Sequence, residues 1–220
     1  MNNITKNRLR RGFTLAEVLI TLLIIGVVAS IVIPGLISNT SDAEYAVALK
    51  KAYANLSQVT RSIITENSGI AGTYTNDATL MSLYTPYLNV ARTCAVGTGD
   101  GVCWPAGNLS YLSGGSYADI NGMFPTALLA DGTTIAFRNM AADCSFTMGD
   151  QIQVVCASLY VDVNGLKGPN RLGKDTFWFR VTKQGIYPWG TYNDGYSDCS
   201  KSTNGFGCAG KVIKEGAINY

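Results

Sequence analysis

Glu17 is the one charged side chain in an apolar run that extends from Phe13 to Ile33. As an α-helix with a rise of about 1.5 Å per residue, this run would be roughly 30 Å long, which matches the hydrocarbon core of a membrane. A carboxylate in lipid costs roughly 3 kcal/mol or more, so it usually marks a site with a partner. Cleavage between Gly12 and Phe13 would create an amino group near the membrane surface. A neighbouring copy could offer that amine to Glu17, which we therefore interpret as an intersubunit docking charge.

The segment before this run is short and basic. Residues 1–12 contain no acidic residue and four basic ones, which are Lys6, Arg8, Arg10 and Arg11. Pro34 follows the apolar run at the point where the sequence becomes polar. The basic leader, the Gly12–Phe13 junction, the offset of Glu17 and the length of the run together resemble the prepilin signal of type IV pilins and type II secretion pseudopilins.

This resemblance implies a series of processing and assembly steps. A prepilin peptidase would cleave after Gly12 and methylate the new amino terminus on Phe13. Glu17 would align incoming subunits, and the apolar helices would pack in the core of a filament. The implied partners are other pilin or pseudopilin subunits, the prepilin peptidase and the inner-membrane assembly machinery. The implied location is the bacterial inner membrane, crossed once with the globular domain outside the cytoplasm, and then a pilus or pseudopilus.

Three simpler kinds of N-terminal signal account for fewer features of this segment. In a secretory signal, a run of only 7 to 15 apolar residues precedes a small-residue cleavage site, which residues 28–30 could imitate. The apolar run here is longer and contains Glu17. Arg10 and Arg11 suggest a twin-arginine signal, but acidic residues are disfavoured in the apolar part of such a signal. An uncleaved anchor needs only length, so it accounts for neither the Gly12–Phe13 junction nor Glu17.

The composition argues against an enzyme and against a nucleic-acid-binding domain. The chain contains no His, which removes the commonest general base and the commonest metal ligand. A Ser-His-Asp or Cys-His site therefore cannot form within this chain. The leader holds four of the 17 Lys and Arg and none of the 15 Asp and Glu, so 13 basic and 15 acidic residues remain after cleavage. Nucleic acid is consequently not an expected partner of the exported domain.

Six Cys residues fall into three local pairs, which are Cys94 and Cys103, Cys144 and Cys156, and Cys199 and Cys208. Six Cys allow 15 connectivities, and none of the pairs has the CxxC spacing of a metal finger. Nearest-neighbour disulfides are the simplest prediction, since each loop is short and rich in Gly or turn residues. Disulfides indicate an oxidising compartment, in agreement with export. A zinc site is the alternative.

One loop carries a candidate cation site. Asp162, Asn164 and Asp175 supply oxygen ligands of the kind that Ca²⁺ prefers. The segment resembles a loop of pseudopilin-like proteins, some relatives of which bind calcium nearby. The full EF-hand spacing is absent, and Lys167 and Lys174 would oppose a cation. The other interpretation, which we favour, is that these side chains form turns and accept hydrogen bonds from backbone amides. No other cofactor is expected.

The remaining sequence predicts an α+β fold in which a long helix packs on a small antiparallel sheet. A helix over 13–67 combines the membrane-spanning or filament-core part, 13–33, with an amphipathic part whose apolar stripe is Tyr45, Leu49, Ala52, Leu56, Val59 and Ile63. We expect a globular domain over 34–220, in which a variable region covers 70–125, the sheet 126–182 and a C-terminal loop 183–220.

Within these regions several elements are predicted individually. A short helix is expected over 79–89, and the Gly-rich segment 97–122 is predicted to be loop. Residues 126–130 and 133–138 form a hairpin pattern around a two-residue Asp131–Gly132 turn. Two further strands are expected over 151–163 and 175–182, and residues 211–214 could add an edge strand. In the strand over 151–163 one face would hold Val155, Ala157, Leu159, Val161 and Val163.

Two functions from different classes remain open. The first is a structural subunit of a type IV pilus or a type II secretion-like pseudopilus, polymerised through its N-terminal helix. The second is a minor or tip subunit, whose segment 97–122 or disulfide-closed tail would bind a surface, DNA or an exported protein. A membrane-anchored enzyme is the least favoured. The prepilin-type segment is common to adhesion, motility, DNA-uptake and secretion machines, so it does not distinguish among them.

Overall fold

The computed structural model describes residues 13–148, 152–191 and 199–220. They divide into two units, one that ends at Ser41 and one that begins at Asp42. Helix α1, Leu15–Glu66, contributes to both units and continues past Pro34. The predicted leader, residues 1–12, lies outside the described residues.

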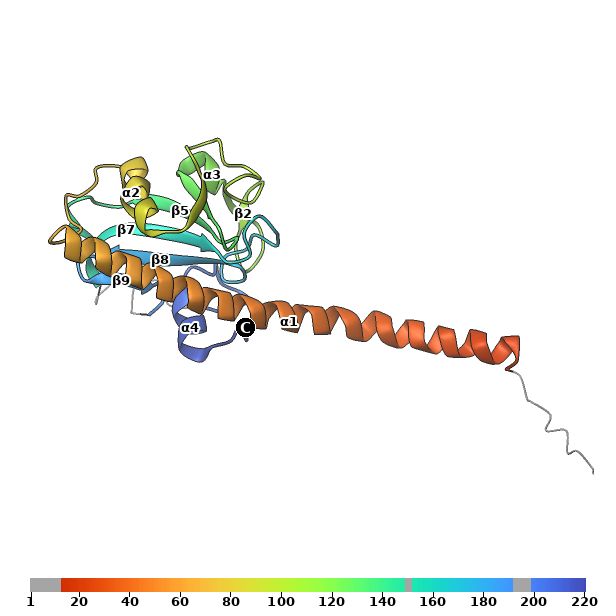
Figure 1. Cartoon of the computed structure of the whole chain (residues 1–220). Coiled ribbons are helices and arrows are strands. Elements are labelled where there is room, and N and C mark those ends of the chain that lie inside the picture. The colour runs from red at the N-terminus through yellow and green to blue at the C-terminus, as the bar shows by residue number, and fades with distance from the viewer. Residues whose placement is uncertain (1–12, 149–151, 192–198) are drawn as a thin grey trace, which may run out of the picture. The chain divides into compact units, whose positions relative to one another are not determined.

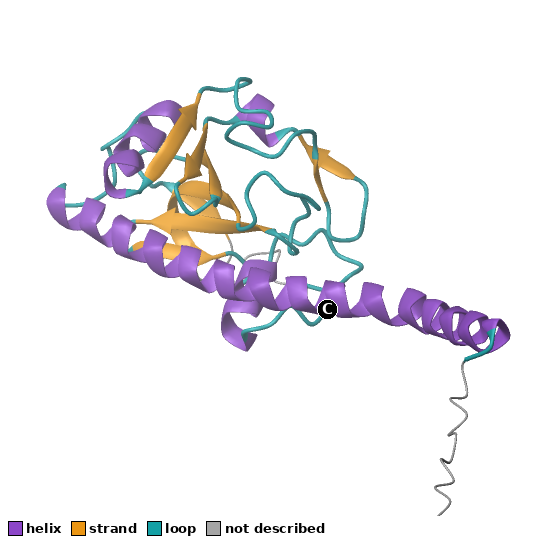
Figure 2. Ribbon diagram, turned by 45° about the vertical axis from the view of Figure 1, so that its right-hand side comes forward, coloured by secondary structure: helices purple, strands orange, loops and turns teal. Residues whose placement is uncertain are grey.

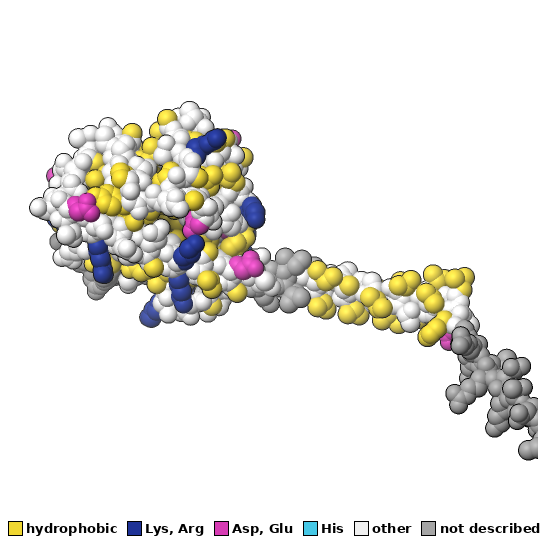
Figure 3. Space-filling view, viewed as in Figure 1, with side chains coloured by type: hydrophobic (Ala, Val, Ile, Leu, Met, Phe, Trp, Pro, Cys, Tyr) yellow, Lys and Arg dark blue, Asp and Glu magenta, His cyan; other side chains and the backbone are white. Residues whose placement is uncertain are grey.

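The first unit contains the apolar part of α1. Its stretch Leu15–Ile33 has a mean hydropathy of 2.7 and is long and apolar enough to span a membrane. None of that stretch is buried by the rest of the protein, and apolar side chains form much of its surface (Figure 3). A helix that exposes Leu, Ile and Val in all directions needs lipid or other apolar helices around it.

The second unit is built on an antiparallel sheet, whose strands are orange in Figure 2. Among the described residues it has seven strands in the order β1-β4-β5-β7-β8-β9, with β6 paired to β7. The strands are β1 Val90–Cys94, β4 Thr126–Leu129, β5 Thr134–Asn139, β6 Phe146–Met148, β7 Ile152–Asp162, β8 Thr176–Thr182 and β9 Gly185–Pro188. The second half of α1 lies along one face of this sheet (Figure 1). The predicted α+β class is therefore correct.

The helix stripe and the alternating strands meet in the main core. Leu49, Leu56 and Ile63 on α1 are at most 1 % exposed, and Tyr45 and Ala52 pack against the same cluster. The strands contribute, among others, Leu159, Val161, Phe177, Phe179 and Val181. This is the arrangement that the period of 3.6 in the helix and the period of 2 in the strands predict.

One side chain of the predicted strand face is placed differently. Val155 is buried but lies outside the helix-facing cluster, whereas Cys156 lies within it. The pairing register between β7 and β8 shifts between Val155 and Ala157, and Val154 has a φ of 75°. A bulge of this kind inserts one residue and reverses the facing of those before it. The alternation therefore holds from Ala157 onward but not at Val155.

The opposite face of the sheet is buried as well. Residues of the Gly-rich segment and of the C-terminal segment pack on this face and form a second hydrophobic cluster with it. The cluster contains Trp104, Leu109, Ile120, Phe124, Trp178, Trp189 and Phe206. The predicted loop over 97–122 contains a two-stranded sheet, β2 Leu109–Ser110 with β3 Ser116–Ala118, and the short helix α3 Ile120–Met123. The prediction of a single apolar face was thus incomplete.

Two local predictions need correction. The β4–β5 turn has three residues, because the Leu129 N–H donates to the Thr133 carbonyl and Gly132 has a φ of +91°. Residues 211–214 are not an edge strand but part of helix α4, Cys208–Glu215. Ala209 and Val212 are buried on one side of that helix, which is helical rather than strand periodicity.

The other elements agree with the sequence pattern. Helix α2 Asp77–Tyr84 and the 3₁₀ turn η1 Thr85–Tyr87 occupy the region predicted to contain a short helix. The Asn76 side chain starts α2 by accepting a hydrogen bond from the Thr79 N–H at 2.9 Å. Three disulfides join Cys94 to Cys103, Cys144 to Cys156 and Cys199 to Cys208, which confirms the nearest-neighbour prediction. No Cys is left to serve as a zinc ligand.

Candidate functional site

Glu17 and Thr14 form a reciprocal cap at the start of α1. Glu17 Oε2 accepts hydrogen bonds from the Thr14 N–H and from the Thr14 hydroxyl, both at 2.8 Å. The Glu17 N–H in turn donates to Thr14 Oγ1 at 3.2 Å. Because Leu15 is the first helical residue, Thr14 is the N-cap and Glu17 is the third residue of the helix. This is a capping box of the Thr-x-x-Glu type.

The cap fixes one oxygen of Glu17 and leaves the other accessible. Among the described residues, none donates a hydrogen bond to Oε1. A carboxylate with one oxygen held by its own helix and one oxygen open can still accept a hydrogen bond from an ammonium group. The residues around it, such as Phe13 at 87 % exposure, do not shield it. Glu17 was predicted as a docking charge only, and its partner Thr14 was not identified, although the Thr-x-x-Glu spacing was a sufficient signal.

We expect Thr14→Ala to loosen the start of α1. Loss of the Thr14 hydroxyl leaves the Glu17 N–H without its acceptor and costs about 1 kcal/mol. Amide hydrogen exchange of residues 15–18 in detergent micelles should then become about fivefold faster, since 1.4 kcal/mol corresponds to a factor of ten. Thr14→Ser, which keeps the hydroxyl, should exchange like the wild type. Equal rates in the Ala and Ser variants would show that the cap does not hold the helix start.

The candidate calcium residues are engaged in a hydrogen-bonded loop. Asp162 Oδ1 accepts from the Asn164 N–H at 3.1 Å, and Oδ2 accepts from the Thr176 hydroxyl at 2.7 Å. Asp175 accepts from the backbone N–H groups of Asn170 and Arg171 at 2.8 and 2.7 Å. Both carboxylates are fully buried. The two Asp side chains thus do what the turn interpretation predicts, which is to accept hydrogen bonds from backbone and hydroxyl donors.

The fit of this loop to a metal ion is poor. Among the described residues, no group of three or more Asp, Glu or Cys side chains is arranged so that it could hold a metal ion. Lys174 forms an ion pair with Asp42 on α1, so the loop already carries the positive charge of the Lys174 ammonium group. The Asn164 side-chain N–H₂ donates to the Tyr45 hydroxyl and to the Gly168 carbonyl, both at 3.0 Å. Asn164 Oδ1 and Asn170 Oδ1 are buried and accept no hydrogen bond from the described residues.

Burial governs the protonation of the two acids. Removal from water, and secondly the neighbouring charge of Asp175, raise the pKa of Asp162 well above its ordinary value of 3.8. Removal from water also raises the pKa of Asp175, although its backbone hydrogen bonds act in the opposite direction. The folded protein therefore holds protons on this pair at pH values where the unfolded chain has lost them.

Stability should consequently decrease with rising pH over this range. When the pKa of a carboxyl group is higher in the folded than in the unfolded protein, its contribution to stability is complete below the unfolded pKa, near 3.8. The contribution is lost as the pH rises through the pKa of the folded protein. We expect the free energy of unfolding, measured with denaturant from pH 4 upward, to fall more steeply in the wild type than in Asp162→Asn. Parallel curves for the two proteins would contradict this assignment.

The second face of the sheet carries a buried cation among aromatic rings. Arg180 is fully buried, and its guanidinium lies 3.6 Å from the centre of the Trp189 ring. Trp178 lies between Tyr160 and Trp189, at ring distances of 4.5 and 3.8 Å. A strand with bulky side chains on both faces is typical of a sheet buried on both sides. That pattern in β8 was the signal for this cluster, which was not predicted from the sequence.

Comparison with known proteins finds one match. Residues 7–33 match the family described as the prokaryotic N-terminal methylation motif, a stretch that includes Gly12, Phe13, Thr14 and Glu17. No curated protein and no solved structure matches the chain. The protein therefore carries the prepilin-type signal of type IV pilins and pseudopilins at its N-terminal helix. This motif is the signature of pilin-like and pseudopilin precursors.

The motif has two direct implications. It implies processing by a prepilin peptidase and assembly with other pilin subunits. The apolar helix near the start of the chain fits the membrane anchor of such a protein. The matched residues end at Ile33, so the second unit, from Asp42 onward, is described by its own structure alone.

Proposed function

We propose that this protein is a structural subunit of a type IV pilus or a type II secretion-like pseudopilus. The prepilin peptidase cleaves it after Gly12 and methylates Phe13, and the helix 13–33 holds it in the bacterial inner membrane until assembly. The observation that carries the proposal is the match of residues 7–33 to the methylation motif, with Glu17 as the one acid in the apolar run. The exported unit with its disulfides lies outside the cytoplasm, where oxidation of Cys is possible.

The physical basis of assembly is an exchange of lipid contacts for subunit contacts. Apolar side chains such as Leu19 and Ile31 are 58 % and 74 % exposed, so the helix can pack equally well against lipid or against other helices. Such packing alone does not fix the axial position of one helix against the next. A pair between Glu17 Oε1 and the amine of Phe13 on an adjacent subunit sets that position, because an unpaired charge in an apolar bundle is much costlier than a pair.

The processing step is tested by the N-terminus of the protein extracted from membranes. N-terminal sequencing and intact mass should show a chain that begins at a methylated Phe13 and has lost residues 1–12. A protein that still begins at Met1 in cells with an active prepilin peptidase would contradict the proposal. A Gly12→Val variant provides the matched control, since it should keep the leader while the exported unit folds normally.

A binding role as a minor or tip subunit is the second candidate function. It is favoured by a cavity of about 520 Å³ on the exported unit, next to the disulfide-tied start of α4. Subunit stoichiometry separates the two roles. A major subunit dominates the protein content of sheared filaments, whereas a tip subunit is scarce in them.

We propose further that the loop around Asp162 and Asp175 is structural and holds no calcium. The hydrogen bonds to both carboxylates support this choice over the metal site. Addition of calcium at roughly 5 mM, above the dissociation constants of weak extracellular sites, should leave the melting temperature of the full chain unchanged. A rise of several degrees that chelator reverses and that Asp175→Asn abolishes would establish the metal site instead.

A further inference from the structure

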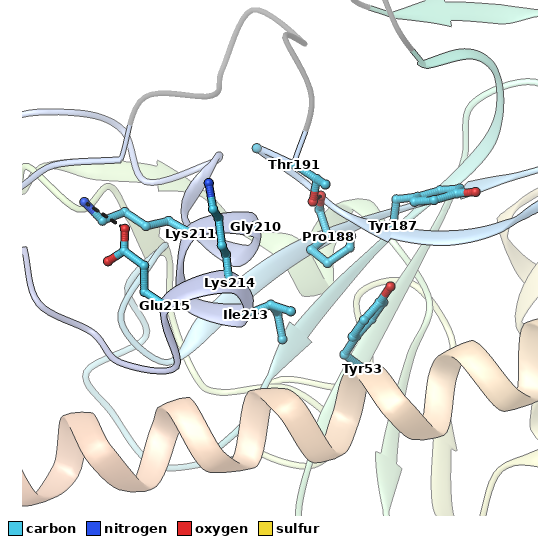
Figure 4. Close-up of a pocket in the computed structure, with 10 residues that line it drawn as sticks. Tyr53, Tyr187, Pro188, Thr191, Gly210, Lys211, Ile213, Lys214 and Glu215 are labelled. Carbon is cyan, nitrogen blue, oxygen red and sulfur yellow. Dashed lines mark hydrogen bonds and ion pairs between the residues drawn. The ribbon is translucent and has the colours of Figure 1, made fainter.

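The exported unit contains a cavity whose lining combines cations, hydroxyl groups and an aromatic ring. Its volume is about 520 Å³, which lies within the usual range for small-ligand sites. Its walls come from three elements, which are α1, the end of β9 with the turn after it, and α4 (Figure 4). All of these residues belong to the second unit, so the cavity does not depend on the membrane helix.

The walls of this cavity are held in place by close backbone packing. The Gly210 N–H donates to the Trp189 carbonyl at 2.8 Å, which ties α4 to the turn after β9. A Cβ at Gly190 would lie 1.9 Å from the Gly207 carbonyl oxygen, so only glycine permits this approach. The Cys199–Cys208 disulfide fixes the first residue of α4. A site with rigid walls loses little conformational entropy when it binds a ligand.

The positive charge of the cavity comes from α4. Lys211 and Lys214 are three residues apart, so their side chains leave the helix on neighbouring positions. The distance between Lys211 Nζ and Glu215 Oε1 is 4.0 Å, which is the outer limit for an ion pair. Lys214 is exposed and has no acidic partner among the described residues. Figure 4 shows Lys214 between the Lys211–Glu215 end of the cavity and the end formed by Tyr53 and Tyr187.

The remaining lining suits a ligand with hydroxyl groups and a compact apolar body. Tyr53 is stacked on Phe179 at a ring distance of 5.8 Å, and together with Pro188 and Ile213 it forms the apolar part. Glu215 can accept hydrogen bonds from ligand hydroxyls. An added peptide strand fits less well, because β9 has four residues and ends in Pro188, whose carbonyl already accepts from Thr191 at 2.7 Å.

We propose that this cavity binds an acidic sugar, with its carboxylate on Lys214 and Lys211, its hydroxyls on Glu215 and its carbon-hydrogen face on the apolar part that includes Tyr53. A simple inorganic anion would use the two lysines and leave Glu215 and the apolar part without a partner. A neutral sugar would leave the lysines without a partner. The combination of all three features is what selects a sugar that carries a carboxylate.

The test uses the full-length protein in detergent micelles and saturation-transfer NMR, with glucuronic acid as the probe and glucose and inorganic phosphate as comparison ligands. We expect glucuronic acid to bind, to lose affinity as salt is raised, and to bind at least fivefold more tightly than glucose or phosphate. Lys214→Met should weaken glucuronic acid binding at least fivefold. Lys201→Met, at an exposed lysine outside the cavity, should leave it unchanged.

Three results would overturn the assignment. They are absence of glucuronic acid binding, equal affinity for glucose or phosphate, and equal loss in the Lys214 and Lys201 variants. The proposed filament function is read out separately, by cleavage after Gly12 and by incorporation into filaments. Lys214→Met should be processed and assembled like the wild type, so failure of sugar binding and failure of assembly are distinguishable.

Discussion

Glu17→Ala should leave the protein exported and folded but reduce its incorporation into filaments at least tenfold. In the proposed assembly the Glu17 carboxylate neutralises the amine of Phe13 on an adjacent subunit. Removal of one partner of a buried pair typically costs about 3 to 5 kcal/mol, since it leaves the other charge unpaired in an apolar environment. The measurement is the fraction of the protein in sheared filaments relative to the membrane pool, determined by quantitative immunoblotting.

The structure indicates a sharper version of this experiment. Glu17 also accepts hydrogen bonds from Thr14 at the start of α1, so the Ala variant removes both a charge and a cap. Gln can replace Glu in a capping box but cannot neutralise an amine. Glu17→Gln should therefore assemble as poorly as Glu17→Ala. Wild-type assembly of Glu17→Gln would show that the cap, and not the charge, is what assembly requires.

A second glutamate on the same helix provides the control. Glu44 is exposed on α1 within the second unit and lies outside the apolar stretch. Glu44→Ala should be exported, processed and incorporated like the wild type. A comparable loss of assembly in Glu44→Ala would mean that acidic residues on α1 act through general charge rather than through the position of Glu17.

Asp175→Ala is expected to have the largest effect on the stability of the second unit, Asp42–Tyr220. Its two carboxylate oxygens accept the backbone N–H groups of Asn170 and Arg171, and the side chain is fully buried. Both hydrogen bonds are partly buried, and a donor left unsatisfied away from water costs about 1 to 3 kcal/mol. Part of this cost is offset because the repulsion between Asp175 and Asp162 disappears. We expect a net loss of about 3 kcal/mol, which corresponds to a decrease in melting temperature of roughly 6 to 12 °C for a unit of this size.

Asp143→Ala is the matched control for this substitution. Asp143 also accepts hydrogen bonds from a backbone N–H and a hydroxyl, those of Ser145 at 3.0 and 2.7 Å, but it is exposed. Water can replace the Asp143 carboxylate as the acceptor of these hydrogen bonds, so we expect Asp143→Ala to lower the free energy of unfolding by less than about 1 kcal/mol. Near-ultraviolet circular dichroism of the Trp cluster follows unfolding in both variants. Equal melting temperatures for Asp175→Ala and Asp143→Ala would remove the structural role assigned to the buried loop.

Features with a local physical cause were predicted correctly. The stripe Leu49, Leu56 and Ile63 follows from helical periodicity, and the alternation of Phe177 and Phe179 with Trp178 follows from strand periodicity. The nearest-neighbour disulfides have the same origin, because their loops are short in sequence. The capping box of Thr14 and Glu17 is equally local, and was missed although its spacing is visible in the sequence.

Features that depend on distant segments were not predictable in the same way. The second face of the sheet is buried by Trp104, Trp189 and Phe206, which come from irregular segments with no periodicity to indicate their direction. The bulge between Val155 and Ala157 changed the facing of Val155, since the register of β7 depends on its pairing with β8. The cavity beside α4 is lined by Tyr53 and Lys214, which are far apart in the chain, so their proximity could not be predicted from local sequence.

The amino-acid sequence was sufficient to predict a membrane-length apolar helix with one acidic residue, a prepilin-type signal and an α+β fold. These properties reside in neighbouring residues, so their chemistry can be recognised before any folding is known. The folded structure was needed to establish that both faces of the sheet are buried, that Asp162 and Asp175 lie in a hydrogen-bonded loop, and that a cationic cavity forms between α1, β9 and α4. The physical reason is that burial and cavity shape arise from contacts between segments that are distant in the chain.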